Sequence, residues 1–217
     1  MNISPSIIDS NKRFLLIDRI QGHTQTLGPG VRAVVWFHGC SRKCPGCIAA
    51  NMNISTDFEQ STPGDLLESI KSTDDIEGIT ISGGEPFDQN IGALHEFLHG
   101  IKTGTNLSVM AYTGYLMKEL VENRQTRGLL RYIDILVDGP YVQSLDFGQL
   151  WRGSENQQIH FLSNRYASLK NVAERKGRSV EVSIVDGRAF SFTGIPPKGF
   201  RKRLEDRLSE KDLAVVW

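Results

Sequence analysis

All three cysteines of this 217-residue chain lie within eight residues, as Cys40, Cys44 and Cys47. A C-x3-C-x2-C triplet can give three thiolates to one metal centre, but it cannot fill a site of four thiolates. Three thiolates on a [4Fe–4S] cube leave one iron open, and an open iron does chemistry where a closed one only transfers electrons. Because the number of cysteines is odd, internal disulfides are disfavoured. The triplet therefore predicts a cluster held by these three residues.

A structural zinc site is the alternative interpretation of the triplet. His38 lies two residues before Cys40 and would add one nitrogen to the three sulfurs. Three cysteines and one histidine are a known set of zinc ligands. Zinc ligands usually come as two separated pairs, however, and the sequence has no second cysteine pair.

A glycine pair ends a short β-rich run at residues 79–86. Two glycines let the backbone leave a strand tightly and approach a ligand without Cβ clashes. An acidic residue and open backbone groups at such a strand end can bind an ammonium and a carboxylate. We therefore expect a bulky residue at Gly84 to lower cofactor affinity and leave iron content unchanged. The predicted cofactor-binding residues of this turn are Ser82, Gly83, Gly84, Glu85 and Pro86.

The cysteine loop and this turn together resemble the radical S-adenosylmethionine (SAM) superfamily, whose Gly-Gly-Glu-Pro turn binds the methionine amino group. Most members have an aromatic residue before the last cysteine. Gly46 stands there instead, as in the anaerobic ribonucleotide reductase activases. The resemblance covers about residues 13–165 and keeps its order along the chain. Further segments similar to that group lie at residues 28–32, 112–115, 137–141 and 151–157.

The resemblance implies that the three cysteines hold a [4Fe–4S] cluster and that SAM chelates its open iron. One electron from an external donor, such as flavodoxin or ferredoxin, would cleave SAM to methionine and a 5′-deoxyadenosyl radical. In the activase family this radical takes a hydrogen from a glycine of a protein partner, a glycyl radical enzyme. The alternatives are a radical SAM enzyme acting on another peptide or a small molecule, and a non-catalytic zinc-binding module.

The composition is that of a cytoplasmic enzyme. The chain has 25 Lys and Arg against 25 Asp and Glu, so its bulk charge implies no nucleic-acid partner. No apolar run approaches the length that spans a membrane, and the N-terminus lacks the regions of a signal peptide. Reduced thiols fit a reducing compartment. We therefore expect a cytoplasmic oxidoreductase without a membrane or nucleic-acid partner.

Alternating strand and helix patterns predict an α/β fold with a parallel sheet covered by helices. About five or six strands are too few for eight βα units, so an open, partial (βα) barrel is expected, and the resemblance implies the same fold. The expected strands are 13–20, 31–38, 78–82, 107–112, 133–137 and 158–162. One helix is expected to begin at Thr62, and two more are expected at residues 89–101 and 115–123.

Four motifs follow strand ends, and parallel sheets place their ligand sites at the carboxyl ends of strands. Tyr112 and Thr113 are expected to line an adenosine pocket, although a tyrosine there also suits packing. Asp138 is expected to anchor a cation or a ribose hydroxyl, or alternatively to cap the next turn. Arg32 follows a glycine turn and is expected to face the cluster loop.

Residues 1–165 are predicted to form the core and residues 166–217 an extension. Alternation around Asp186-Gly187 predicts a β-hairpin. After Pro196-Pro197 comes a mixed-charge helix with Phe200, Leu204 and Leu208 on one stripe. We expect this extension to pack over the open edge of the barrel. The alternative is a docking element for a protein substrate.

Overall fold

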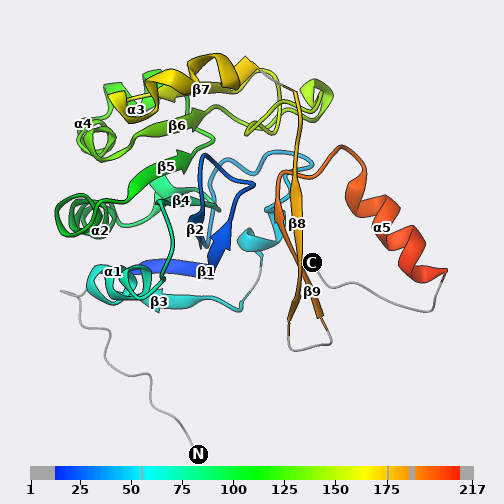
Figure 1. The fold of residues 1–217 in the computed structure, drawn as a ribbon, viewed down its shortest axis with the longest axis horizontal. Coiled ribbons are helices and arrows are strands. Elements are labelled where there is room, and N and C mark those ends of the chain that lie inside the picture. Colours follow the sequence, from blue (N-terminus) through cyan, green and yellow to red (C-terminus); the bar gives the residue numbers. More distant parts are fainter. Residues whose placement is uncertain (1–12, 55, 175, 186–188, 211–217) are drawn as a thin grey trace, which may run out of the picture.

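The computed structural model describes residues 13–54, 56–174, 176–185 and 189–210. Its centre is a seven-stranded sheet in the order β3-β1-β2-β4-β5-β6-β7 (Figure 1). Four central strands are parallel to one another. They are β2 (Arg32–Phe37), β4 (Gly78–Gly83), β5 (Ser108–Tyr112) and β6 (Ile135–Asp138). The mixed α/β architecture predicted from the sequence is confirmed.

The outer strands run antiparallel to their neighbours, so the prediction of a parallel sheet is wrong at both sides. They are β1 (Leu15–Thr24), β3 (Glu59–Ser61) and β7 (Gln158–Phe161). A parallel connection needs a crossover of a dozen or more residues, usually a helix. The connection from β1 to β2, residues 25–31, is too short for such a crossover. The connection from β6 to β7, residues 139–157, contains only the short turn Gln143–Leu145. In both places the next strand therefore runs antiparallel to the one before it.

One face of the sheet is covered by helices (Figure 1). Alternation along β2 turns Ala33, Val35 and Phe37 toward these helices, where they join the main hydrophobic core. The helix predicted at residues 89–101 is confirmed, and its Leu94 and Phe97 side chains are fully buried in this core. The helices are α1 (Pro63–Lys71), α2 (Ile91–Gly104), α3 (Met117–Glu122) and α4 (Arg124–Arg127), with further 3₁₀ turns at Ala50–Asn53, Pro86–Asp88, Leu130–Tyr132 and Asn164–Glu174.

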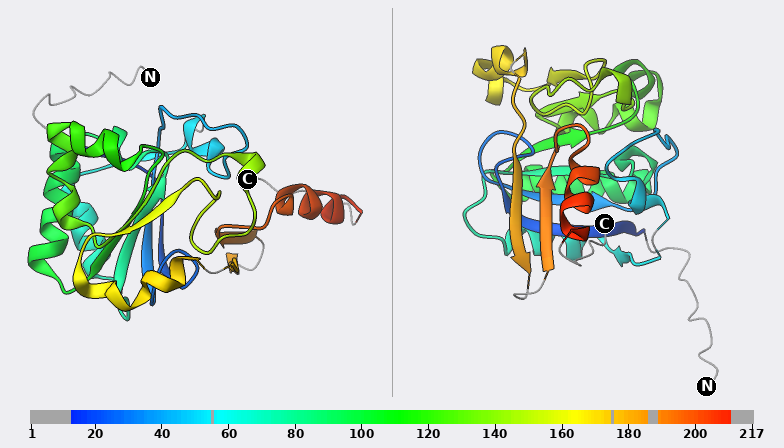
Figure 2. Two further views of the ribbon diagram at one scale, coloured as in Figure 1. Left: turned by 90° about the horizontal axis from the view of Figure 1, so that it is seen from above. Right: turned by 90° about the vertical axis from the view of Figure 1, so that its right-hand side faces the viewer.

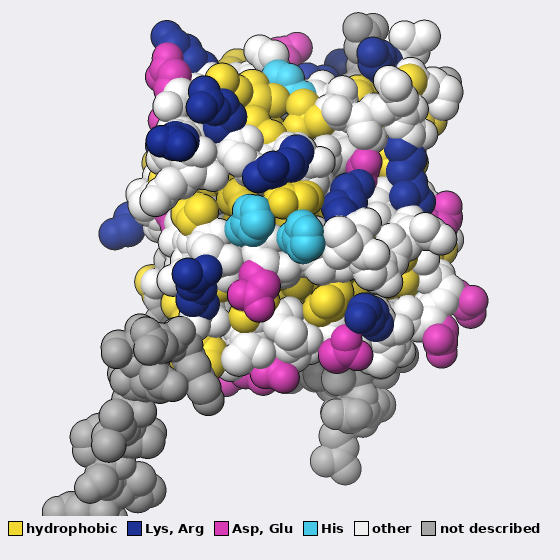
Figure 3. Space-filling view, turned by 90° about the vertical axis from the view of Figure 1, so that its left-hand side faces the viewer, with side chains coloured by type: hydrophobic (Ala, Val, Ile, Leu, Met, Phe, Trp, Pro, Cys, Tyr) yellow, Lys and Arg dark blue, Asp and Glu magenta, His cyan; other side chains and the backbone are white. Residues whose placement is uncertain are grey.

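The outer surface of the helices carries the histidine pair of α2 (Figure 3). His95 and His99 are stacked with ring centroids 6.1 Å apart, and the Tyr132 hydroxyl lies 3.0 Å from His95 Nε2.

None of the helices that the structure describes is long and apolar enough to cross a membrane.

The opposite face of the sheet carries polar residues from the central strands. Arg32 is completely buried there. Its guanidinium donates to Thr80 Oγ1 at 2.7 Å and to Ser108 Oγ at 2.9 Å. The expectation that Arg32 faces the cluster loop is wrong, because Arg32 begins β2 whereas the cysteine loop follows the other end of the same strand.

The C-terminal segment forms a two-stranded hairpin, β8 (Val180–Val185) and β9 (Ala189–Gly194), followed by α5 (Phe200–Ser209). The predicted hairpin is confirmed, although its Asp186-Gly187 turn lies outside the described residues. Arg19 of β1 donates to Ser191 Oγ at 3.1 Å, which ties the hairpin to the main sheet.

Helix α5 extends away from the body of the molecule (Figure 2). Phe200, Leu204 and Leu208 of its apolar stripe are only half-buried. Phe200 packs edge to face on Phe192 of β9, with ring centroids 5.6 Å apart. The hairpin is therefore the part of the extension that lies against β1, while α5 keeps part of its apolar stripe accessible.

Candidate functional site

The motifs singled out in the sequence meet at the carboxyl edge of the parallel strands. The Gly84 amide donates to the Phe37 carbonyl at 2.7 Å, and the Glu85 amide donates to the Gly39 carbonyl at 2.8 Å. The Thr113 amide donates to the Val137 carbonyl at 2.9 Å. The ends of β2, β4, β5 and β6 are thus joined at one edge, where parallel sheets place their ligand sites.

The three cysteines lie in a tightly turned loop directly after β2. The Cys47 amide donates to the Cys44 carbonyl at 3.2 Å, and Lys43 and Gly46 adopt left-handed backbone angles, with φ of 46° and 76°. All three thiols are half-buried. Burial raises the pKa of the Cys47 thiol, and the nearby Cys44 and Cys40 raise it further. The Cys40 and Cys44 thiols therefore oppose ionisation of the Cys47 thiol.

The donor set fits an iron–sulfur cluster better than a single zinc ion. Tetrahedral zinc needs four ligands that converge on one point, whereas the thiolates of a cube bind different irons. Among the described residues, no group of three or more His, Cys, Asp or Glu side chains is arranged to hold one metal ion. The His38 ring stacks on Phe58 with centroids 4.3 Å apart, and its Nδ1 lies 3.6 Å from Asp18 Oδ1. The arrangement does not favour the zinc alternative.

Side chains of Asp88, Tyr115 and Glu119, which lie outside the cysteine loop, hold it in place. The sequence had assigned this role to none of them. Asp88 accepts the Ser41 amide at 2.7 Å and the Tyr115 hydroxyl at 2.6 Å. Arg42 lies 3.3 Å from Glu119 and 4.5 Å over the Tyr115 ring. The role of Asp88 could have been suspected from the sequence, because Asp88 stands two residues after the Gly-Gly-Glu-Pro turn. The role of Glu119 could not, since it depends on where α3 lies in the folded protein.

Gly84 lies directly against the start of the cysteine loop. A Cβ on Gly84 would lie 2.0 Å from the Gly39 carbonyl oxygen and 2.7 Å from its carbon. These are backbone atoms, so they cannot swing aside as a side chain would. The expectation that a bulky residue at Gly84 leaves iron content unchanged is therefore not supported, because the segment leading into Cys40 would have to move.

The side chain of Glu85 is turned into the protein, where its exposed fraction is 1 %. Its carboxylate accepts hydrogen bonds from the Phe87 amide at 3.1 Å, the Thr113 hydroxyl at 2.8 Å and the Gly114 amide at 2.7 Å. Burial is the largest influence and raises the pKa of Glu85 to about 7, although the three hydrogen bonds oppose this rise. Glu85 thus connects the ends of β4 and β5, while its own amide joins the turn to Gly39, just before the cysteine loop.

Glu85 is expected to make the free energy of unfolding fall as pH rises. Its pKa is about 7 in the folded protein against a usual 4.5, so the folded state binds the proton more tightly. This contribution to stability is complete below pH 4.5 and is lost as pH rises through about 7. Each pKa unit corresponds to about 1.4 kcal/mol.

Urea unfolding of the cluster-free protein at pH 5 and pH 8 measures this effect. Relative to wild type, Glu85→Gln should flatten the change between the two pH values by about 1 to 3 kcal/mol. Glu68→Gln is the matched control, because the Glu68 side chain is 72 % exposed. A Glu85→Gln protein with the same pH dependence as wild type would contradict the assignment.

Thr113 and Asp138 use their side chains within the protein. Besides its bond to Glu85, Thr113 Oγ1 accepts the Tyr115 amide at 3.1 Å. Asp138 accepts the Met117 amide at 2.6 Å and lies 3.2 Å from His160 Nε2. Burial opposes a low pKa for Asp138, but His160 and the amide donors hold it below its usual value. Both residues lie at the predicted edge, where they join neighbouring segments.

Tyr112 and Asn156 leave buried polar atoms without a partner at the same end of the fold. The Tyr112 hydroxyl and Asn156 Oδ1 have no hydrogen-bond partner among the described residues. Burial raises the pKa of Tyr112, so its hydroxyl stays protonated and can donate. Buried polar groups are normally hydrogen-bonded, so these atoms retain bonding capacity for a ligand. Tyr112 contacts the hydrophobic clusters around Trp36 and Met110 on the face away from the helices.

Comparisons with known proteins agree with this arrangement. A family model described as a 4Fe-4S single cluster domain matches residues 26–160. The anaerobic ribonucleoside-triphosphate reductase-activating protein of Vibrio cholerae serotype O1 is 34% identical over 140 residues, which are 61% of this chain and 89% of that protein. The proteins of the same name from Enterobacteria phage T4 and Escherichia coli K12 are 31% and 32% identical over 65% and 62% of this chain, and 91% of each is covered.

Among solved structures, QueE from Escherichia coli aligns with a TM-score of 0.37 at 16% identity. The alignment covers 46% of this chain and 53% of that chain. A likeness at this level does not establish a shared fold.

Proposed function

The chain belongs to the 4Fe-4S single cluster family together with the anaerobic ribonucleoside-triphosphate reductase-activating proteins, and on this premise we propose that it activates a glycyl radical enzyme. The observation that carries the proposal is the meeting of the three-cysteine loop and the glycine turn at one strand edge. When bound there, a [4Fe–4S] cluster and SAM supply a 5′-deoxyadenosyl radical that takes a hydrogen from a glycine of the partner.

Cys40, Cys44 and Cys47 would hold three irons of the cluster and leave the fourth for SAM. In support, their thiols are half-buried and share one short loop. Asp88 and Glu119 would hold this loop in place, through Ser41, Tyr115 and Arg42. A loop held at several points presents its ligands at the spacing that a cluster needs.

The predicted cofactor residues would divide into two roles. The backbone of residues 82–86 and the side chain of Tyr112 would contact SAM, because the turn lies beside the cysteine loop and the Tyr112 hydroxyl is without a partner. Glu85, Thr113 and Asp138 would instead hold the turn and the strand ends in position, since their side-chain oxygens already accept hydrogen bonds within the protein. Ser82 and Pro86 flank the same turn and complete the predicted set.

The fold that we propose is an open, partial (βα) barrel of the radical SAM type, with a core at residues 1–165 and an extension at 166–217. Four parallel strands with the site at their carboxyl ends support it. An external one-electron donor such as flavodoxin or ferredoxin would reduce the cluster, and a cytoplasmic location would keep the thiols reduced.

Anaerobic reconstitution tests the proposal directly. The chain should bind about four irons and four sulfides, as expected for one cube, and should release 5′-deoxyadenosine from SAM when dithionite is added. With the anaerobic ribonucleoside-triphosphate reductase of the same organism, electron paramagnetic resonance should detect a glycyl radical. Cleavage of SAM without a radical on the reductase would favour another substrate, and stoichiometric zinc without sulfide would overturn the proposal.

A further inference from the structure

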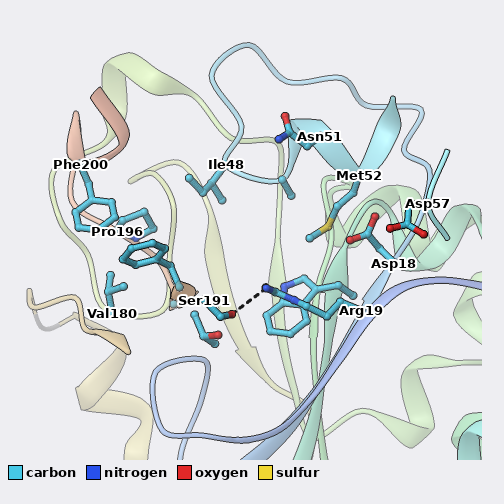
Figure 4. Close-up of a pocket in the computed structure, with 15 residues that line it drawn as sticks. Asp18, Arg19, Ile48, Asn51, Met52, Asp57, Val180, Ser191, Pro196 and Phe200 are labelled. Carbon is cyan, nitrogen blue, oxygen red and sulfur yellow. Dashed lines mark hydrogen bonds between the residues drawn. The ribbon is translucent and has the colours of Figure 1, made fainter. Parts of the chain in front are cut away.

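A cavity of about 370 Å³ lies between the cysteine loop, β1 and the C-terminal extension (Figure 4). One wall begins at Ile48 and Ala49, immediately after the last cysteine, and continues to Met52. The opposite wall is made by the hairpin and the start of α5. The apolar lining of the cavity as a whole comes from Ile48, Met52, Trp36, Val180, Pro196 and Phe200.

The two ends of this cavity differ in chemistry. Figure 4 shows Asp18 and Asp57 together at one end, and Val180, Pro196 and Phe200 at the other. Arg19 lies between them, 4.3 Å over the Trp36 ring, and it donates to Ser191 Oγ at 3.1 Å. Arg19 keeps its positive charge in these contacts, so Asp18, Asp57 and Arg19 together give the lining a net charge of −1, and the negative charge lies at the end that holds the two carboxylates. The cavity therefore suits a ligand with a cation at one end and an apolar group at the other.

The position of the cavity also indicates a protein ligand. The hairpin and α5 lie beyond residue 160, where the match to the family model ends. This chain thus adds one wall to a core whose other wall is the cysteine loop itself. A protein whose glycine reacts at the carboxyl edge of the strands has to approach beside that loop. The added wall extends the surface that such a partner meets first.

We propose that this cavity receives a segment of the glycyl radical partner, with a lysine or arginine side chain at Asp18 and Asp57 and an apolar side chain against Pro196 and Phe200. The inference rests on the proposed function and adds the surface that recognises the partner. Anchoring of an apolar side chain in a pocket beside a charged rim is the usual energetic pattern of protein interfaces.

Two variants of the full, reconstituted chain test the two ends separately. Phe200→Ala shortens the apolar wall, and Asp57→Lys reverses a charge at an exposed loop position. The matched controls are Val121→Ala on α3, where Val121 is 42 % exposed, and Glu96→Lys on the exposed surface of α2. The dissociation constant for the anaerobic ribonucleoside-triphosphate reductase is measured by biolayer interferometry. Iron content and SAM cleavage without reductase confirm that every variant is intact.

Each cavity variant should raise the dissociation constant for the reductase about tenfold or more, since hot-spot contacts dominate an interface. Because binding is weaker, the yield of glycyl radical at limiting reductase should fall in the cavity variants, while both controls behave as wild type. Wild-type affinity in both cavity variants would overturn the inference and leave the proposed function standing. If the wild-type chain cleaves SAM but neither binds nor activates the reductase, the proposed function is wrong, and so is the assignment of this reductase as the partner. Should Phe200→Ala destabilise the extension, Asp57→Lys still decides the question, because its loop lies outside α5.

Discussion

Replacing Cys44 by alanine is expected to abolish the iron–sulfur cluster. The chain has three cysteines in total, all in one loop, so the variant offers two thiolates where the cube needs three. Iron and sulfide should fall from about four of each per chain to background after anaerobic reconstitution. Visible absorption and SAM cleavage should be lost with them.

The matched control for this change is Ser41→Ala in the same loop. Ser41 is held through its backbone amide, which donates to Asp88, while its hydroxyl makes only a 3.4 Å contact with Tyr115. This variant should therefore reconstitute with a full cluster. A Cys44→Ala protein that keeps its iron and sulfide would show that the cluster has ligands elsewhere in the chain.

Gly84→Ala is expected to reduce both iron content and SAM cleavage, and Gly84→Val should do so more strongly. The added Cβ would lie 2.0 Å from the Gly39 carbonyl oxygen, so the strand end, the cysteine loop or both have to shift. Overpacking of this kind costs about 1 to 3 kcal/mol, and here the displaced backbone leads into Cys40. Iron per chain and the melting temperature of the reconstituted protein measure the effect.

Gly64→Ala in α1 is the matched control. Its Cβ would have Thr62 Oγ1 as nearest neighbour at 3.9 Å, an ordinary contact. Alanine in a helix is about 0.5–1 kcal/mol more favourable than glycine, so this variant should be at least as stable as wild type. A Gly84→Ala protein with full iron and impaired SAM binding would instead mean that the turn meets only the cofactor.

Much of this protein was predictable from local sequence patterns. The cysteine spacing, the glycine turn and the strand–helix alternation depend on residues close in the chain. Each predicted strand and helix is found within a few residues of its predicted position, whereas the short elements β3 and α4 were not predicted. Thr62 caps α1 by accepting the Asp65 amide, as its hydroxyl before Pro63 indicated. The convergence of four motifs on one edge also followed, because parallel strands share their carboxyl ends.

The roles of single polar side chains were less accessible. Glu85 was predicted to bind cofactor, and Asp138 either to bind it or to cap the next turn. In the structure both carboxylates accept hydrogen bonds from neighbouring segments. An acid at a strand end has the same sequence signature in either role. Whether it faces a ligand or the interior depends on donors such as Gly114 and Met117, which other parts of the chain bring to it.

The sequence by itself determined the cluster chemistry and the order of elements, because three thiolates in eight residues and the periodicity of strands and helices are local properties. Only the tertiary structure decided the directions of β1 and β7, the burial of Arg32 beneath the sheet, and the contact between Gly84 and Gly39. It also decided that the hairpin and the cysteine loop enclose a cavity. These features join segments far apart in the chain, and the burial that sets their energies exists only once those segments have packed together.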